Sequence, residues 1–553
     1  MTAVRRYLYP RRNSTQSLKR PRGREARKTG ALWQNEHVSV PINTPVTPRT
    51  SGLSNRGGRS WLIVGIAGVG SLAVSLISGT HVVLAAVTLP LVISLAWSSP
   101  VTLITILPVW MTLLGFVRRF TPGGGNVTFS GDPVLIIGPV ALIVLLIVTL
   151  SAKGAPPLSK LARVVLAFNI VALIEVANPS QGGLMAGLGG LLFVFVPTLA
   201  FWVGRKFGTP DVLWRVAWNV AILSLFAAVY GLYQQFVRFP TWDLTWIESK
   251  GYTALNLGSG VIRAFGTFSS AQEYAVFLSV GVVVWAVLAA RESRWPLPLH
   301  LAALATVAIA LFYESQRTSI FITALALGII TAARFKMRPV TVAIFGVAAV
   351  AALVVFAGSI GGSSGSAALQ GPDSTSSVLI NHQLSGITDP TGAGSSLPGH
   401  IKATRVGMFS AFKSPFGHGS GSTNLAASRY SSSSHTKGTE FDPGNMGIAF
   451  GIFGLIIYFF MLWRMTSMGY RLAVARRDPL GLLVLGVIMA TLLQWTNGNL
   501  YSVCWLLWFV VGAGDGMLTR RDLESEVANP LPSSAPESFT WRKPGEPRRA
   551  VRV

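Results

Sequence analysis

The stretch PVLIIGPVALIVLLIVTL, residues 133–150, decides the fold class, because it runs for 18 residues without a charged side chain. A helix that crosses the roughly 30 Å hydrocarbon core of a bilayer needs about 20 mostly apolar residues. Segments of the same kind lie on both sides of this one. The pattern predicts a membrane protein with several spanning helices.

The composition agrees with this prediction. Of the 553 residues, 50% are hydrophobic and only 12% are charged, whereas charged residues make up about 25% of a soluble domain. The single cysteine excludes a secreted disulfide scaffold. The high apolar content excludes a largely disordered chain. A basic chain this apolar is also not an ordinary nucleic-acid binder, and no nucleic acid is expected as a partner.

About fourteen apolar segments are separated by polar or helix-breaking residues, and they predict an all-α, polytopic transmembrane helix bundle. They lie at 61–78, 81–97, 101–117, 133–150, 161–177, 183–204, 216–237, 272–290, 297–313, 318–333, 339–358, 446–463, 480–495 and 499–516.

The distribution of Lys and Arg predicts the orientation. If the N-terminus is inside, the short inner connections hold 15 basic residues, and the much longer outer connections hold 11. Short loops rich in Lys and Arg stay in the cytoplasm. We therefore expect both termini to be cytoplasmic and the number of spans to be even.

Three regions follow from these boundaries. Residues 1–60 hold 13 Lys or Arg and two acidic residues without apolar periodicity, which predicts a disordered cytoplasmic tail that contacts anionic membrane lipids. Residues 61–518 form the transmembrane domain. Residues 519–553 are rich in Pro and mixed in charge, and we expect a second disordered cytoplasmic tail.

Two outer connections, 238–271 and 359–445, are too long to be simple turns. Within the second, IKATRVGMFSAFKSPFG has Val406, Phe409 and Phe412 at three-residue spacing among basic residues. This pattern predicts a short helix that lies in the membrane interface.

Four of the seven histidines fall in the same outer loop. Imidazole can take up a proton near neutral pH, so one of them is a candidate general base, although loop histidines are often simply exposed. No pair has the i, i+4 spacing of a helical metal site, and no cysteine is nearby, so no metal is expected. The four are His382, His400, His418 and His435.

Two arginines stand where an outer-facing helix begins. Arg263 precedes a Gly-containing turn and a span, and Arg317 lies in a short turn between two spans. A guanidinium fork beside a helix N-terminus can bind an anionic group. Glu273 and Glu314 are close in sequence, so structural ion pairs are the alternative interpretation.

Together, these features resemble the superfamily of bacterial O-antigen ligases and O-antigen polymerases. The resemblance covers residues 200–465 and rests on five motifs in order. They are YGLYQQF at 230–236, Arg263 with GTF at 266–268, SQRTS around Arg317, RVGMFSAFKSPFGHGSG at 405–421, and GIFG at 451–454.

The resemblance implies an inverting, metal-independent glycosyltransferase without a cofactor, multi-pass in the bacterial cytoplasmic (inner) membrane and active on its outer face. It would transfer a glycan from undecaprenyl diphosphate to a glycan or lipid-linked acceptor, as a polymerase or ligase for cell-surface polysaccharide assembly, where other assembly proteins are possible partners. Arg263, Arg317 and Arg405 would bind the diphosphate. His435 would be the base, but Asp442 lies closer to the next span and is the alternative.

A different class of function is a transporter or flippase that moves lipid-linked sugars or another polar solute. Transporters tend to show internal repeats and ionisable residues near the bilayer midplane, and the sequence shows neither. A structural or scaffolding membrane protein is a third interpretation.

Overall fold

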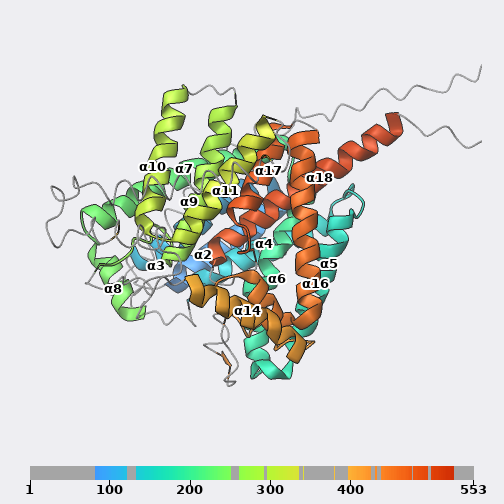
Figure 1. Cartoon of the computed structure of the whole chain (residues 1–553), viewed down its shortest axis with the longest axis horizontal. Coiled ribbons are helices and arrows are strands. Elements are labelled where there is room, and N and C mark those ends of the chain that lie inside the picture. The colour runs from blue at the N-terminus through green and yellow to red at the C-terminus, as the bar shows by residue number, and fades with distance from the viewer. Residues whose placement is uncertain are drawn as a thin grey trace, which may run out of the picture. The chain divides into compact units, whose positions relative to one another are not determined.

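The computed structural model describes residues 81–120, 132–250, 261–291, 296–335, 341, 379, 397–424, 430–431, 438–475, 478–495 and 500–528. Over these residues the chain is all-helical, and none of them forms a strand (Figure 1). The all-α prediction is confirmed at this level.

The main helices are α2 (His81–Ser98), α3 (Pro100–Phe120), α4 (Ile137–Ser151), α5 (Lys160–Ile174), α6 (Leu184–Phe207), α7 (Pro210–Phe236), α8 (Thr241–Lys250), α9 (Ala271–Ala290), α10 (Leu297–Glu314), α11 (Arg317–Arg334), α14 (Leu397–Lys413), α16 (Asp442–Tyr470), α17 (Pro479–Ala490) and α18 (Tyr501–Ala528). Short 3₁₀ segments are η2 (Pro133–Ile136), η3 (Glu175–Ala177) and η4 (Pro179–Gln181), and a π-helical segment, η7 (Arg471–Ala475), follows α16.

Ten helices in the described part of the chain are long and apolar enough to cross a membrane. They are α2, α3, η2 with α4, α6, α7, α9, α10, α11, α16 with η7, and α18. The chain therefore has the architecture of a multi-pass helical membrane protein. The predicted span 61–78 and the tail 1–60 lie outside the described residues, as does the predicted span 339–358 except for residue 341.

Two predicted spans form shorter helices. The span expected at 161–177 is α5, which ends at Ile174 after 15 residues, because an Asn-Pro turn follows in which the Asn178 side chain accepts a hydrogen bond from the Ser180 N–H. The span expected at 480–495 is α17, which ends at Ala490 after 12 residues. Beyond it, the Leu493 carbonyl accepts the backbone N–H of Asp442.

The predicted start of the C-terminal tail at residue 519 is wrong, because α18 continues to Ala528. Two ion pairs hold this extension against the start of α17 and the end of α16. Arg521 lies 2.5 Å from Asp478, and Asp522 lies 3.4 Å from Arg471. The polar residues after 518 therefore extend the last helix.

Polar contacts between elements separate the helix ends into two sets. One set joins ends that the sequence assigns to the outer side, here called the predicted outer end: Arg118 with Asp132, Arg119 with Asp243, Arg263 with Glu314, Tyr501 with Leu135, and Trp495 with Asp442. The other set joins the predicted inner ends: Arg205 and Ser159 with Asp515, Arg520 with Arg205, and Arg521 with Asp478. None of these contacts crosses from one set to the other, which fits the predicted alternation of helix direction.

The core lies around α9 and α18, which are buried along most of their length. Small residues let α18 approach α6 closely. A Cβ atom on Gly512 would lie 2.0 Å from the Phe201 carbonyl oxygen, and one on Gly204 would lie 2.2 Å from that of Phe509. Such backbone proximity is typical of packed membrane helices.

Candidate functional site

The GTF motif forms a tight turn, residues 265–268, at the predicted outer end. The Phe268 N–H donates to the Phe265 carbonyl at 3.0 Å. Gly266 has a φ of +51°, which a residue with a side chain rarely adopts. A Cβ atom on Gly115 of α3 would lie 2.5 Å from the Phe268 carbonyl carbon, so the turn packs directly on the α3 backbone. We call these residues the GTF turn.

Two glutamines of the YGLYQQF motif hold the chain that leads into the GTF turn. The Gln234 side-chain oxygen accepts the N–H of Gly266 at 2.8 Å and that of Phe265 at 3.2 Å. The Gln235 side-chain oxygen accepts the Ala264 N–H at 3.0 Å. The first two resemblance motifs therefore form one hydrogen-bonded unit.

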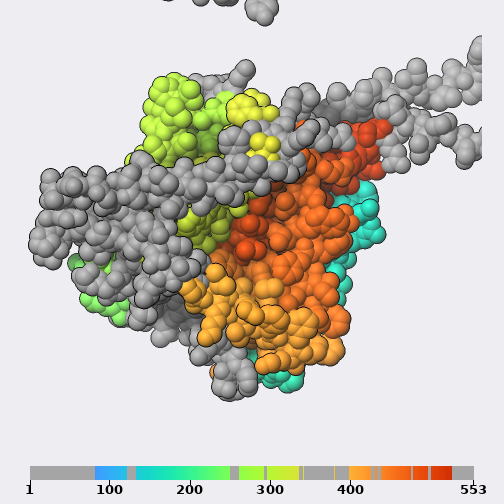
Figure 2. Space-filling view, viewed as in Figure 1, coloured from blue at the N-terminus to red at the C-terminus, as the bar shows by residue number. Residues whose placement is uncertain are grey.

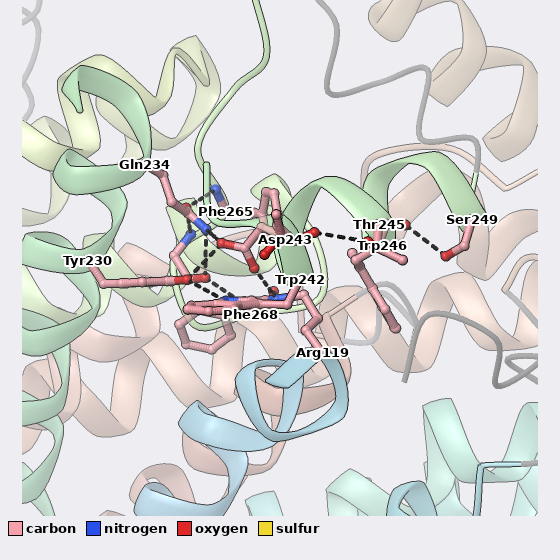
Figure 3. A network of polar contacts seen from close by, with 12 residues as sticks. Arg119, Tyr230, Gln234, Trp242, Asp243, Thr245, Trp246, Ser249, Phe265 and Phe268 are labelled. Atoms are coloured by element: carbon pink, nitrogen blue, oxygen red, sulfur yellow. Dashed lines mark hydrogen bonds and ion pairs between the residues drawn. The ribbon is translucent and has the colours of Figure 1, made fainter. Parts of the chain in front are cut away.

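A buried ion pair completes this unit (Figure 3). Arg119 Nε lies 2.7 Å from Asp243 Oδ1, and neither side chain is exposed. The Arg119 guanidinium also donates to the carbonyls of Phe268 and Gly266. Asp243 Oδ2 accepts from the Tyr230 hydroxyl and from the Gln234 amide, both at 2.7 Å. One arginine thus fixes the GTF turn to α3 and α8.

Arg118, the neighbour of Arg119, forms a second buried cluster. Its Nε donates to Asp132 Oδ2, and His81 Nδ1 lies 3.0 Å from Asp132 Oδ1. Burial alone would raise the pKa of Asp132, but the hydrogen bonds and charges of His81 and Arg118 lower it from 3.8 to about 2. Asp132 also caps the following 3₁₀ segment by accepting the Val134 N–H.

Arg263 lies two residues before the GTF turn. Its Nη2 lies 2.5 Å from Glu314 Oε1, and its Nε donates to the Glu314 carbonyl at 3.0 Å. The Arg263 side chain is 16% exposed, whereas that of Glu314 is fully buried. The predicted alternative of a structural ion pair is therefore realised for Glu314, and the Arg263 side chain is mostly buried in it.

Arg317 belongs to the same local structure. The other Glu314 oxygen accepts the Gln316 N–H at 3.0 Å, and α11 begins at the next residue, Arg317. Ser315 turns the chain with a φ of +73°. Glu314 thus orders the turn between α10 and α11 and holds Arg263 against it, so the first three resemblance motifs meet at one place.

Arg405 lies elsewhere, on the exposed face of α14. Its guanidinium carbon is 5.6 Å from the ring centroid of Phe409. The helix expected within 359–445 is present as α14, which packs along the beginning of α16 (Figure 1), while its place in a membrane interface stays a prediction. His400 lies 3.4 Å from Glu440 beside it.

The last two resemblance motifs form a second unit. α16 is broken at Gly451, which has a φ of +62° and a ψ of −151°, a conformation that glycine alone readily adopts. The Ile452 N–H donates to the Pro415 carbonyl, while the carbonyls of Ile448 and Ala449 accept the N–H groups of the residues at 418 and 419. The GHGSG segment is therefore an ordered partner of the broken helix.

Of the two candidate bases, the structure describes Asp442 only. Asp442 is fully buried at the start of α16, where its Oδ2 accepts the Trp495 N–H and the Tyr458 hydroxyl. These contacts favour an anchoring role for this carboxylate. His435 lies outside the described residues.

Two carboxylates bind the backbone at the two ends of the α17–α18 connection. Asp442 accepts the N–H of Trp495, and Glu273 accepts the N–H of Ser502 at 2.8 Å. Asp442 begins α16 and Glu273 lies in the first turn of α9, just after the GTF turn. The two ends of the connection thus contact the helix that contains GIFG and the helix that follows the GTF turn.

Sequence reasoning missed Arg118, Arg119 and Asp243 as parts of the site. The available signal was the pair of adjacent arginines at the end of an apolar span, since buried arginines require partners. The described residues contain no cluster of three His, Cys, Asp or Glu side chains that would suit a metal ion.

Neither a scan against protein-family models nor a search of curated proteins finds a match for the chain.

Proposed function

We propose that the protein is a glycosyltransferase that acts on lipid-linked glycans at the outer face of the bacterial cytoplasmic membrane, as the resemblance implies. The observation that supports this proposal is that Arg263, beside the GTF turn that Gln234 and Gln235 hold, binds the Glu314 turn from which α11 begins at Arg317.

The chemistry follows from these residues. A diphosphate leaving group gains negative charge as the bond to the sugar breaks, and oriented guanidinium groups stabilise that charge. The Arg263 side chain keeps 16% of its surface exposed and is fixed by Glu314, so it is held in place before the ligand arrives. Arg317 adds a second cation at the N-terminus of α11, where the helix dipole also favours an anion.

The acceptor hydroxyl needs a base, and His435 remains the proposed residue. Asp442 is the less favoured candidate because its carboxylate is buried and engaged by Trp495 and Tyr458. Arg405, on the exposed face of α14, is not assigned to the phosphates that Arg263 would bind.

The broken helix α16 is a feature that transporters share, because discontinuous spans often line their substrate sites. Here the backbone groups around Gly451 are already hydrogen-bonded to residues 415–419. Because these backbone groups already have partners within the chain, they are not free to bind a substrate, which favours the enzyme over the transporter or flippase.

The test is the size distribution of surface polysaccharide, and of lipid-linked repeats, in cells with matched protein levels. Arg263→Ala, Arg317→Ala and His435→Ala should each abolish long glycan. Arg291→Ala is the matched control, because Arg291 lies at the opposite end of α9 and its guanidinium carbon sits 4.1 Å from the Trp214 ring centroid.

Arg263→Ala also leaves Glu314 buried without its cation, so a fold defect must be separated from a lost ligand contact. The double variant Arg263→Ala with Glu314→Gln removes both charges. A folded but inactive double variant supports ligand binding by Arg263. An active one means that Arg263 only neutralises Glu314, and the proposed site would be wrong.

The pattern of products distinguishes the remaining possibilities. Single repeats that accumulate outside the membrane indicate a polymerase, and finished chains on the lipid carrier indicate a ligase. Repeats that accumulate only on the cytoplasmic side would contradict the enzyme and favour the transporter.

A further inference from the structure

Helix α14 has its large apolar side chains on the outside. Val406, Phe409, Phe412 and Phe416, just after the helix, are between 56% and 70% exposed. The fully buried residues of α14, Gly407 and Ala411, are small, and Met408 is the large apolar side chain that packs on the core. A Cβ atom on Gly407 would lie 2.8 Å from the Gly444 carbonyl oxygen. In water, the large apolar side chains would be expected on the inner face.

The exposed face also carries the cations of the helix. Lys402, Arg405 and Lys413 are all exposed, and residues 397–413 include no acidic residue. Aromatic and basic side chains on one face are the composition of helices that lie in a membrane interface. The cations suit phosphate groups, and the rings suit the acyl chains beneath them.

This surface continues onto a membrane-spanning helix. The rings of Phe416 and Phe453 contact each other in a tilted arrangement, with their centroids 5.8 Å apart. Along α16, Phe453, Ile456 and Trp463 are exposed, as expected for a side that faces lipid. Figure 2 shows α14, in gold, adjoining the orange surface of the later helices.

We propose that the exposed face of α14 is a binding surface for anionic glycerophospholipid. The phosphates of the headgroups contact Lys402, Arg405 and Lys413, and the acyl chains lie along Phe412, Phe416 and the exposed side of α16. This proposal does not depend on the glycosyltransferase.

A benzophenone side chain in place of Val406 tests it locally. The full-length protein is placed in liposomes of equal parts phosphatidylcholine and phosphatidylglycerol, irradiated, and the crosslinked lipids are identified by mass. We expect phosphatidylglycerol to be enriched about fivefold or more, since each basic side chain near an anionic surface contributes roughly a fivefold preference.

The triple variant Lys402→Gln, Arg405→Gln and Lys413→Gln should bring the two lipids to equal yield. The charge-preserving triple Lys402→Arg, Arg405→Lys and Lys413→Arg should retain the enrichment, which controls for altered packing. Equal yields in the parent protein, or enrichment that survives the glutamine variant, would overturn the assignment of the headgroups to these cations.

Spin labels give an independent measurement of whether the exposed face of α14 lies in the membrane or in water. Cys504 is the single cysteine and is buried, so a Cys504→Ala background allows labels at Phe409 and, for comparison, at Ile456 on α16 and Glu248 on α8. Phe409 should match Ile456, with greater access to oxygen than to a water-soluble nickel chelate. If it instead matches exposed Glu248, α14 lies in water and the proposal fails.

Discussion

Arg119 and Asp243 form an ion pair with 2.7 Å between Nε and Oδ1, and neither side chain is exposed. The arginine comes from α3 and the aspartate from α8, more than a hundred residues apart in sequence (Figure 3). Because the same guanidinium binds two carbonyls of the GTF turn, this pair fixes the segment that carries Arg263.

Replacement of either partner should therefore destabilise the protein. Removing one member of a buried pair leaves the other charge unpaired and costs about 3 to 5 kcal/mol. Arg119→Met and Asp243→Asn should each lower the thermal unfolding midpoint in detergent. The double variant should lose less than the sum of the two single losses. Strict additivity would show that the two side chains do not interact.

The loss of folding stability at acid pH should depend on Asp132. Its folded pKa of about 2 lies below the ordinary value of 3.8, so it contributes stability above pH 4 that is lost as the pH falls toward 2. The difference corresponds to about 2 kcal/mol. Asp132→Asn should flatten this pH dependence between about 4 and 2. Asp211→Asn, at an exposed position of α7, should leave it unchanged.

Gly115 should tolerate no side chain. A Cβ atom there would lie 2.5 Å from the Phe268 carbonyl carbon and 2.7 Å from the Thr267 carbonyl oxygen, so Gly115→Ala must displace the GTF turn. Overpacking of this kind typically costs about 1 to 3 kcal/mol. The amount of long surface glycan in cells that carry Gly115→Ala should decrease as well. Gly399→Ala is the control, because a Cβ atom at that position meets nothing within 4 Å. Equal behaviour of the two variants would contradict the packing described for the turn.

The packing of the helices at the predicted inner end should depend on Asp515, so its replacement should destabilise the protein. Its carboxylate lies 2.7 Å from Arg205 Nε and accepts the Ser159 hydroxyl, in a nearly buried position. Asp515→Asn should lower stability by about 3 kcal/mol, and Ser159→Ala by about 1 kcal/mol. Asp522→Asn removes an exposed pair and should have little effect. A larger loss from Asp522→Asn than from Asp515→Asn would reverse this ranking.

The sequence predicts the helices well where a long apolar run decides them, as at residues 133–151 and 271–290. It fails at α5, which a local Asn-Pro turn ends, and at α17. After α17, tertiary hydrogen bonds of the backbone at Leu493 and Trp495 to Asp442 hold the chain in a non-helical path.

The site is predictable to a similar extent. Arg263 and Arg317 are predictable because each stands where an outer-facing helix begins, and the structure places Arg263 against the Glu314 turn that leads into Arg317. For Arg119 the sequence offers the neighbouring Arg118 as a signal, but it does not identify the partner Asp243, which lies in a polar segment whose burial no local pattern indicates. Contacts between distant segments determine that part of the site.

The break of α16 at Gly451 has a consequence for how the chain assembles. The groups that occupy the break belong to residues 415–419, which precede α16 and leave the ribosome first. When α16 emerges, its hydrogen-bonding partners have therefore already been synthesised, and the unpaired amide and carbonyls need not wait for a later segment. Exchanging the order of these two segments by circular permutation would leave a broken helix to insert alone, with polar backbone facing hydrocarbon.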